Sequence, residues 1–193
     1  ELRTPLNAII GYCEMLQEDA ADKDFENIEE DLTKVRTAAD QLNGLISEIL
    51  DLTKIEAGKM MISIETVDLD QLVNEIVSIV QPMAKKRANK LAVFYDRKYL
   101  EIHSDPVKLR QIIFNLISNA CKFSEKSVVT LSINFVENEG KNYYQIVVSD
   151  EGIGLTEEQI SQIFNPFVQV DSSVTRATGG TGLGLSITSR IQS

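Results

Sequence analysis

The chain has 193 residues, 43% of them hydrophobic and 25% charged, which is typical of globular proteins with one large or two small domains. Its 29 acidic side chains outnumber the 19 Lys and Arg side chains, and this net charge of −10 argues against a nucleic-acid partner. Because no apolar run reaches the roughly 20 residues of a membrane helix, we expect a cytoplasmic chain without membrane contact, whose parent protein can still be membrane-anchored. Cys13 and Cys121 form no CxxC pair and are predicted to be buried thiols.

Two amphipathic helices are predicted in residues 1–58. Apolar residues recur at steps of three and four over Leu2–Leu16 and again over Ile28–Ile55, where the pattern stops at Gly58. The acidic stretch Glu14–Asp31 is expected to form a solvated connector and the start of the second helix. Two helices cannot bury such broad apolar faces alone, so we expect a homodimer in which two hairpins form a four-helix bundle. Packing of the stripe on the second domain of the same chain is the alternative.

A second domain is predicted over residues 59–193. Its helices and strands follow each other without regular βαβ alternation, which indicates an α+β fold class. We expect helices over Asp68–Ala88 and Asp105–Phe123 and a last helix from about Leu183. Short strands are expected at Ile62–Ile64, Leu91–Tyr95, Tyr99–His103, Val128–Val136 and Tyr143–Ser149.

A polar face is predicted on the helix over Asp105–Phe123. Asn115, Asn119 and Lys122 stand at positions i, i+4 and i+7 of an otherwise apolar helix, so they share one face. Amide oxygens are hard ligands suited to Mg²⁺, and a lysine can meet phosphate as a point charge. The pattern therefore predicts a site for Mg²⁺ and phosphate, with a helix that carries two ordinary surface amides as the alternative.

Glycine-rich segments come after this helix. Asp150 ends an apolar strand before Gly152 and Gly154, where a carboxylate can accept from the adenine amine and glycines allow close approach of the backbone. A plain turn after a strand is the alternative. The glycines of residues 179–184 precede an apolar helix, where free backbone donors favour phosphate. No lysine comes directly after these glycines, so the segment is not a P-loop.

The segment Asn165–Thr178 is rich in Ser, Thr and Asp and lacks a regular pattern, as a lid over a ligand would. Arg176 within it is predicted to reach the terminal phosphate of a nucleotide. An exposed charge on the lid is the alternative.

In this order and spacing, the motifs resemble the core of the sensor histidine kinases over essentially the whole chain. Residues 1–7 are similar to the residues directly after the phosphoacceptor in the H box of that family, and Asn115–Phe123 resembles its N box. Asp150–Gly154 resembles the first glycine box, Phe164–Phe167 the F box and Gly180–Gly184 the second glycine box. The run from the F box onward is similar to kinases that are often hybrids carrying receiver domains.

The resemblance implies a dimerisation and phosphotransfer hairpin over residues 1–58 and an ATP-binding catalytic domain, a Bergerat-type α/β sandwich, over residues 59–193. With ATP and Mg²⁺ as cofactors, the terminal phosphate would pass to a histidine and then to an aspartate in the receiver domain of a response regulator. Asn115 and Asn119 would be the metal ligands. The implied nucleotide contacts are Asn115, Asn119, Lys122, Phe123, Asp150, Gly152, Gly154, Arg176, Gly180, Thr181, Gly182, Leu183 and Gly184.

The acceptor histidine of the family directly precedes the position of Glu1, and the family has further strands after the last helix, so we expect a fragment that is truncated at both ends and does not phosphorylate itself. The resemblance assigns catalytic roles to two residues. Glu1 would help to take the imidazole proton, and Thr4 matches the position linked to removal of phosphate from the regulator. His103 lies far from both in sequence and is predicted to be structural.

Asn115 also separates two reactions. Chaperone and topoisomerase ATPases of the same nucleotide fold carry a water-activating Glu at the matching position. An amide cannot take a proton at neutral pH, which favours phosphate transfer over hydrolysis. A noncatalytic ATP-binding module for dimerisation and signal relay, or a Bergerat-fold ATPase, are the alternatives.

Overall fold

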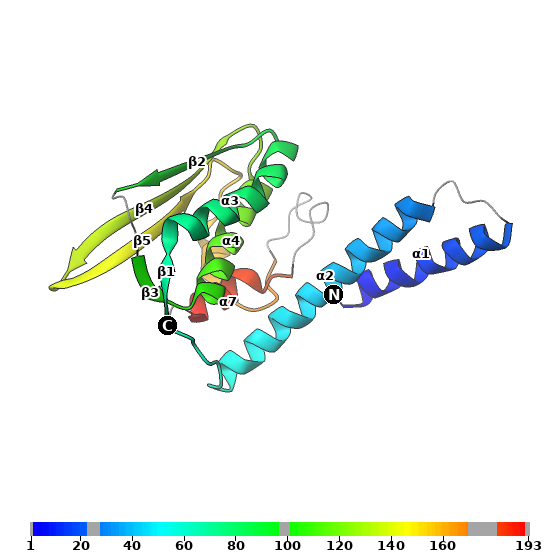
Figure 1. The fold of residues 1–193 in the computed structure, drawn as a ribbon, viewed down its shortest axis with the longest axis horizontal. Coiled ribbons are helices and arrows are strands. Elements are labelled where there is room, and N and C mark those ends of the chain that lie inside the picture. The colour runs from blue at the N-terminus through cyan, green and yellow to red at the C-terminus, as the bar shows by residue number, and fades with distance from the viewer. Residues whose placement is uncertain (1, 23–27, 97–100, 170–180, 192–193) are drawn as a thin grey trace. The chain divides into compact units, whose positions relative to one another are not determined.

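The structure, a computed structural model, describes residues 2–22, 28–96, 101–169 and 181–191. The chain divides into two compact units, Glu1–Met60 and Met61–Ser193 (Figure 1). The first is a helical hairpin and the second is an α/β sandwich, so the predicted α+β class is confirmed.

The hairpin consists of α1 (Arg3–Asp22) packed along α2 (Ile28–Glu56). Over Glu14–Asp22 the expected connector is wrong, because α1 continues to Asp22 through Glu, Gln and Ala residues that favour helix. The expected start of the second helix within this stretch is confirmed, since α2 begins at Ile28, and residues 23–27 lie outside the described residues. The expectation of a buried Cys13 is also wrong. A two-helix hairpin buries only the residues that face the partner helix, and Cys13 lies outside that contact while Cys121 is buried.

Large apolar side chains remain exposed on both helices of the hairpin. Leu2, directly before α1, and Leu6 and Ile10 on α1 repeat at steps of four and are all exposed. On α2, Ile46 and Leu50 are exposed at the same spacing. The single hairpin thus leaves part of its apolar surface uncovered.

The second unit places two helices on one face of a three-stranded sheet (Figure 1). In the sheet, β2 runs parallel to β4, and β4 is antiparallel to β5. A separate antiparallel pair joins β1 to β3. The elements, in chain order, are β1 (Glu65–Asp68), α3 (Leu69–Lys86), β2 (Lys90–Tyr95), β3 (Glu101–Ser104), α4 (Pro106–Phe123), β4 (Val128–Asn138), β5 (Lys141–Ser149), α5 (Glu157–Gln162) and α7 (Gly184–Ile191).

Two of these elements differ from expectation. The first strand is not Ile62–Ile64, because Val67 is the residue that becomes buried, and the pairing of Glu65 with Ser104 sets the register around it. The helix α5 was not predicted. Its local signal is a capping box in which Thr156 and Gln159 satisfy each other's backbone donors.

The core of the second unit lies between the helices and the sheet. Alternate residues of β4 point inward, as the pleat of a strand requires, and meet the apolar faces of α3 and α4. Fully buried side chains of this core include Val73, Ile76 and Val80 on α3, Ile113 and Ile117 on α4, and Val129 and Ile133 on β4.

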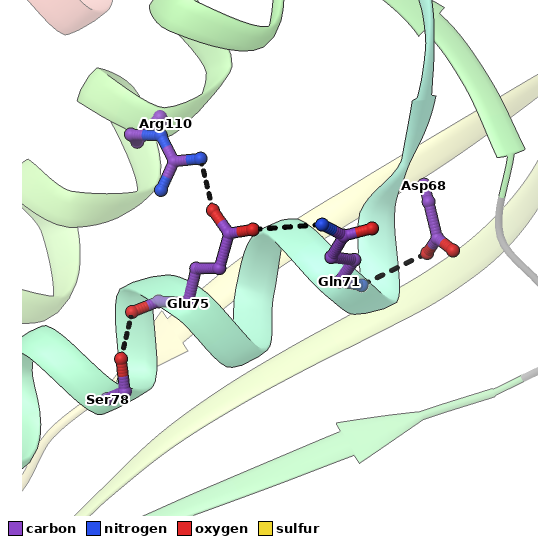
Figure 2. A network of polar contacts seen from close by, with 5 residues as sticks. All are labelled: Asp68, Gln71, Glu75, Ser78 and Arg110. Carbon is purple, nitrogen blue, oxygen red and sulfur yellow. Dashed lines mark hydrogen bonds and ion pairs between the residues drawn. The ribbon is translucent and has the colours of Figure 1, made fainter.

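A polar network at the surface ties α3 to α4 (Figure 2). Asp68 caps α3 by accepting from the backbone of Gln71 over 3.0 Å. The Gln71 side chain donates to Oε1 of Glu75 over 3.1 Å, and Arg110 of α4 donates to Oε2 over 2.5 Å. Both carboxylate oxygens of Glu75 are therefore used, one within α3 and one toward α4.

Candidate functional site

The N-terminus of α4 is fixed by Asp105. Its Oδ1 accepts from the backbone N–H groups of Val107 (2.9 Å) and Lys108 (3.0 Å), and Pro106 suits the first helical position. Its Oδ2 accepts from the backbone of Ser63 over 3.0 Å. These three donors hold the pKa of the Asp105 carboxyl below its usual value. The start of the helix that carries the polar face is thus anchored to the segment before β1.

Asn115 joins α4 to the second glycine-rich segment. Its Nδ2 donates to the carbonyl of Gly184 over 3.3 Å, which makes Oδ1 the atom that this amide can offer to a cation. A Cβ on Gly184 would lie 3.4 Å from Cγ of Asn115, so the helix start and the amide are in close contact. Next to Gly184, Leu183 is fully buried, and its N–H donates to the Thr181 hydroxyl over 3.1 Å.

The loop after β5 lies on the last turn of α4. The backbone of Ile153 donates to the Phe123 carbonyl over 3.3 Å, and Asp150 Oδ1 accepts from the Gly152 N–H over 2.8 Å. A Cβ on Gly152 would stand 2.5 Å from the Phe123 carbonyl oxygen. Only glycine therefore fits between this loop and the helix.

Asp150 itself is exposed at the end of β5. Burial raises the pKa of the Cys121 thiol, and the negative charge of Asp150 raises it further, so the carboxylate lies near that part of α4. A carboxylate in this position can accept a hydrogen bond from a ligand while its neighbours are held by the helix end.

Lys122 is half-buried next to Phe123, with its Nζ 4.9 Å from the ring centroid. Burial lowers the pKa of the Lys122 ammonium, and the positive charge of Arg87 lowers it further. A phosphate group would counter both effects by favouring the charged form.

The end of the F box touches the second glycine-rich segment. Phe167 donates from its backbone to the Gly182 carbonyl over 3.1 Å. Gly182 has a φ of 68°, and a Cβ there would lie 2.9 Å from the Val168 carbonyl oxygen. Both the backbone conformation and the space therefore require glycine at this position.

Other predicted site residues are not drawn into these contacts. Asn119 is half-buried one turn after Asn115. Gly154 has a φ of 66° with open space around it, so glycine is needed there for the backbone conformation of the turn and not for close packing against another segment. Thr4 is exposed in the hairpin unit. His103 is exposed on β3, and its Nδ1 lies 3.4 Å from the Thr66 hydroxyl. The residues Glu1, Arg176 and Gly180 lie outside the described residues.

The side-chain amide oxygens of α4 are of a kind that can bind Mg²⁺. The part of the chain that the structure describes holds no group of three His, Cys, Asp or Glu residues able to bind a metal. Mg²⁺ does not need such a cage, since it is commonly bound by one or two protein oxygens together with phosphate and water. Asn115 and Asn119 can supply amide oxygens of that kind.

Sequence reasoning missed two buried polar residues at the end of α4, Asn89 and Ser124. Asn89 precedes β2 and contacts residues more than 30 positions away, and no local pattern marks it.

Among the described residues, no helix is long and apolar enough to cross a membrane.

Two family models match the chain. Residues 1–58 match the His Kinase A (phospho-acceptor) domain. Residues 104–193 match the family described as histidine kinase-, DNA gyrase B- and HSP90-like ATPase. Sensor protein GacS of Pseudomonas syringae pv. syringae is 38% identical over 99% of the chain, and the chain spans only 21% of that relative.

Solved structures share the fold. Full-length ShkA in complex with AMPPNP matches with a TM-score of 0.70 and 28% identity, over 86% of this chain and 33% of that one. The histidine kinase ThkA in complex with the response regulator protein TrrA matches with a TM-score of 0.62 and 21% identity, over 99% of this chain and 51% of that one.

Proposed function

The chain belongs to the sensor histidine kinase family, and on that premise we propose that it binds ATP with Mg²⁺ and donates the terminal phosphate to a histidine, from which it passes to an aspartate of a response regulator. The observation that carries the proposal is the convergence on α4. Asn115 contacts the second glycine-rich segment at Gly184, and Phe123 contacts the first at Gly152 and Ile153.

The nucleotide is proposed to lie along the polar face of α4. Asp150 accepts from the adenine amine, while Gly152 and Gly154 shape the loop beside it. Lys122 and the backbone donors at the start of α7 face the phosphates. The amides of Asn115 and Asn119 would hold Mg²⁺, which would neutralise part of the phosphate charge. The binding of AMPPNP, an ATP analogue, by the relative ShkA supports this assignment.

Further contacts are proposed for the segment after the F box and for the second glycine box. Arg176 reaches the terminal phosphate, and the backbone of residues Gly180–Gly184 surrounds the phosphate chain, with Thr181, Gly182 and Leu183 between its ends. The tight contact of Gly182 with Val168 supports a close approach of these two segments.

The reaction is proposed to be transfer and not hydrolysis. Hydrolysis needs a base that takes a proton from water, and Asn115, at the position where the ATPases carry one, is an amide bound to the Gly184 carbonyl. In the transfer, the imidazole nitrogen attacks the γ-phosphorus, the bond to the bridging oxygen of ADP breaks, and Glu1 accepts the imidazole proton.

The hairpin is proposed to dimerise and to present the acceptor. The match to a phospho-acceptor domain and the exposed side chains of Leu2, Leu6 and Ile10 support a homodimer of four helices. Thr4 is proposed to act in removal of phosphate from the regulator, whose partnership is supported by the ThkA complex with TrrA. The one histidine of the sequence is His103, so this chain alone is proposed not to phosphorylate itself.

Titration calorimetry with Mg²⁺ and AMPPNP tests binding, and a folded chain that shows no binding would overturn the proposal. Transfer is tested with radiolabelled ATP and a variant that carries one added histidine before Glu1. We expect phosphate on the protein that is acid-labile and base-stable. Release of free phosphate with no labelled protein would favour the ATPase alternative instead.

A further inference from the structure

Asn89 is a buried amide that hydrogen-bonds to the end of α4 from a distant part of the chain. Only 5% of its surface is exposed. Its Nδ2 donates to the carbonyls of Cys121 (3.1 Å) and Ser124 (3.0 Å) and approaches the Ser124 hydroxyl (3.3 Å). Its Oδ1 accepts from the backbone N–H of Ser127 (3.2 Å) and lies 3.4 Å from the Ser127 hydroxyl. One side chain thus holds both the last turn of α4 and the residue before β4.

The last carbonyls of a helix have no partner within the helix and must find one elsewhere. At the end of α4, Asn89 supplies that partner. The amide is itself held in place, because its backbone N–H donates to the Ala84 carbonyl of α3 over 2.9 Å. Asn89 therefore connects the ends of α3 and α4 at a fixed position.

Asn89 donates to the carbonyls of Cys121 and Ser124, and the two residues between these in the sequence are Lys122 and Phe123. Phe123 accepts from Ile153 and leaves no room for a Cβ at Gly152, and Lys122 is the cation of the polar face. A small displacement of this turn would move the lysine and separate the helix from the loop that carries Asp150. The backbones of Gly152 and Phe123 pack so closely that an added Cβ at Gly152 would stand 2.5 Å from the Phe123 carbonyl oxygen, so a displacement of this turn would alter its contact with the loop.

We propose that Asn89 is a positioning residue for the nucleotide site, which acts through the last turn of α4 and does not itself contact the ligand. The inference rests on the proposed function, since it concerns the site for ATP and Mg²⁺. This role requires the N–H donors of Nδ2, because the atoms that the side chain binds on the last turn of α4 are carbonyl oxygens.

The test compares variants of the whole chain that change different parts of this contact. Asn89→Ala removes the donor and the acceptor. Asn89→Asp keeps the shape and an oxygen for the Ser127 N–H, but its carboxylate cannot donate to the two carbonyls. Ser127→Ala is the matched control, because it removes only the long hydroxyl contact to Oδ1. Circular dichroism identifies the variants that are folded at the assay temperature.

We expect both Asn89 variants to bind Mg²⁺–AMPPNP about tenfold or more weakly than the original chain, since two buried carbonyls lose their donor, while Ser127→Ala stays within about twofold. The Asp variant adds a pH profile. A carboxyl buried at this position, facing two carbonyl oxygens, should have a raised pKa, so it becomes protonated as the pH falls and can then donate one hydrogen bond. The affinity of the Asp variant relative to the original chain should therefore recover in part at acid pH.

The outcomes separate the inference from the function on which it rests. If the original chain binds no nucleotide, both are wrong. If the original chain binds and a folded Asn89→Ala or Asn89→Asp chain binds equally well, only the positioning role is wrong. If neither variant folds, Asn89 serves the fold alone and the inference is likewise wrong.

Discussion

Asn115 donates from Nδ2 to the carbonyl of Gly184 over 3.3 Å, a contact between residues 69 positions apart. It joins the polar face of α4 to the first residue of α7, and the 3.4 Å approach of a Cβ at Gly184 to the amide shows how closely they pack. The contact orients the amide oxygen as well. Two motifs that are separate in the sequence are therefore in direct contact.

Asn119→Ala tests the amide pair on α4. We expect Mg²⁺–AMPPNP affinity to fall about tenfold or more, because the variant lacks the amide oxygen that we propose as a metal ligand. Titration calorimetry measures the change. Asn74→Ala, which removes an exposed amide from α3, is the matched control and should leave the affinity unchanged. Equal binding by the Asn119 variant would remove this residue from the site.

Gly152→Ala tests the packing of the loop on α4. The added Cβ would stand 2.5 Å from the Phe123 carbonyl oxygen, so the loop must move. We expect a loss of about 1–3 kcal/mol in the unfolding free energy of this unit together with weaker nucleotide binding. Denaturant titration and calorimetry measure the two effects.

The control for this variant is Gly44→Ala on α2, where an added Cβ meets nothing within 4 Å. Because alanine favours helix, this change should stabilise the hairpin by about 0.5–1 kcal/mol. A Gly152→Ala chain with the original stability and affinity would show that the loop yields without cost.

Asp105→Asn tests the anchor at the start of α4. The pKa of Asp105 is lowered in the folded chain, so its contribution to stability is present above about pH 4, the unfolded value, and is lost as the pH falls through the folded pKa. The Asn side chain cannot accept from all three donors. We expect the unfolding free energy to fall by about 1–2 kcal/mol at neutral pH and to depend less steeply on pH in the acid range.

Denaturant titrations over a series of pH values measure this effect. Asp96→Asn, at an exposed position, is the control and should keep the original dependence of the unfolding free energy on acid pH. If Asp105→Asn keeps the full acid dependence of the original chain, Asp105 is not its source.

Glu75 and Arg110 test the link between α3 and α4. Their side chains are 43% and 41% exposed, so the ion pair should contribute only a small coupling that decreases with added salt. A double-mutant cycle with Glu75→Gln and Arg110→Gln measures it in denaturant titrations. Additive single effects at low salt would show that the pair contributes nothing.

Ile46→Glu tests the proposed dimer. The side chain is 43% exposed in the single hairpin, and a charge in a four-helix interface would be buried without a partner. We expect a dimer for the original chain and a monomer for the variant in sedimentation equilibrium. Gln41→Glu, which adds the same charge at an exposed position on another side of α2, should stay dimeric. A monomeric original chain would contradict the proposed assembly.

Much of the fold was predictable because its signals are local. The helix starts at Asp68 and Asp105 follow from a capping side chain beside an apolar period, and β4 follows from strict alternation. The capping box of Thr156 and Gln159 was equally local and was overlooked. The Ile62–Ile64 strand was wrong because alternation alone does not say which residue becomes buried, and Val67 does.

The sequence by itself determined the helices, the order of the motifs and the chemistry that each can offer, since periodicity, caps and donor atoms belong to neighbouring residues. Only the tertiary structure decided which of these groups meet. Asn115 contacts Gly184, Phe123 contacts Gly152, and Asn89 holds the end of α4, although each pair is far apart in the chain. Such contacts depend on how the helices and strands pack, and packing is a property of the whole core that no local pattern contains.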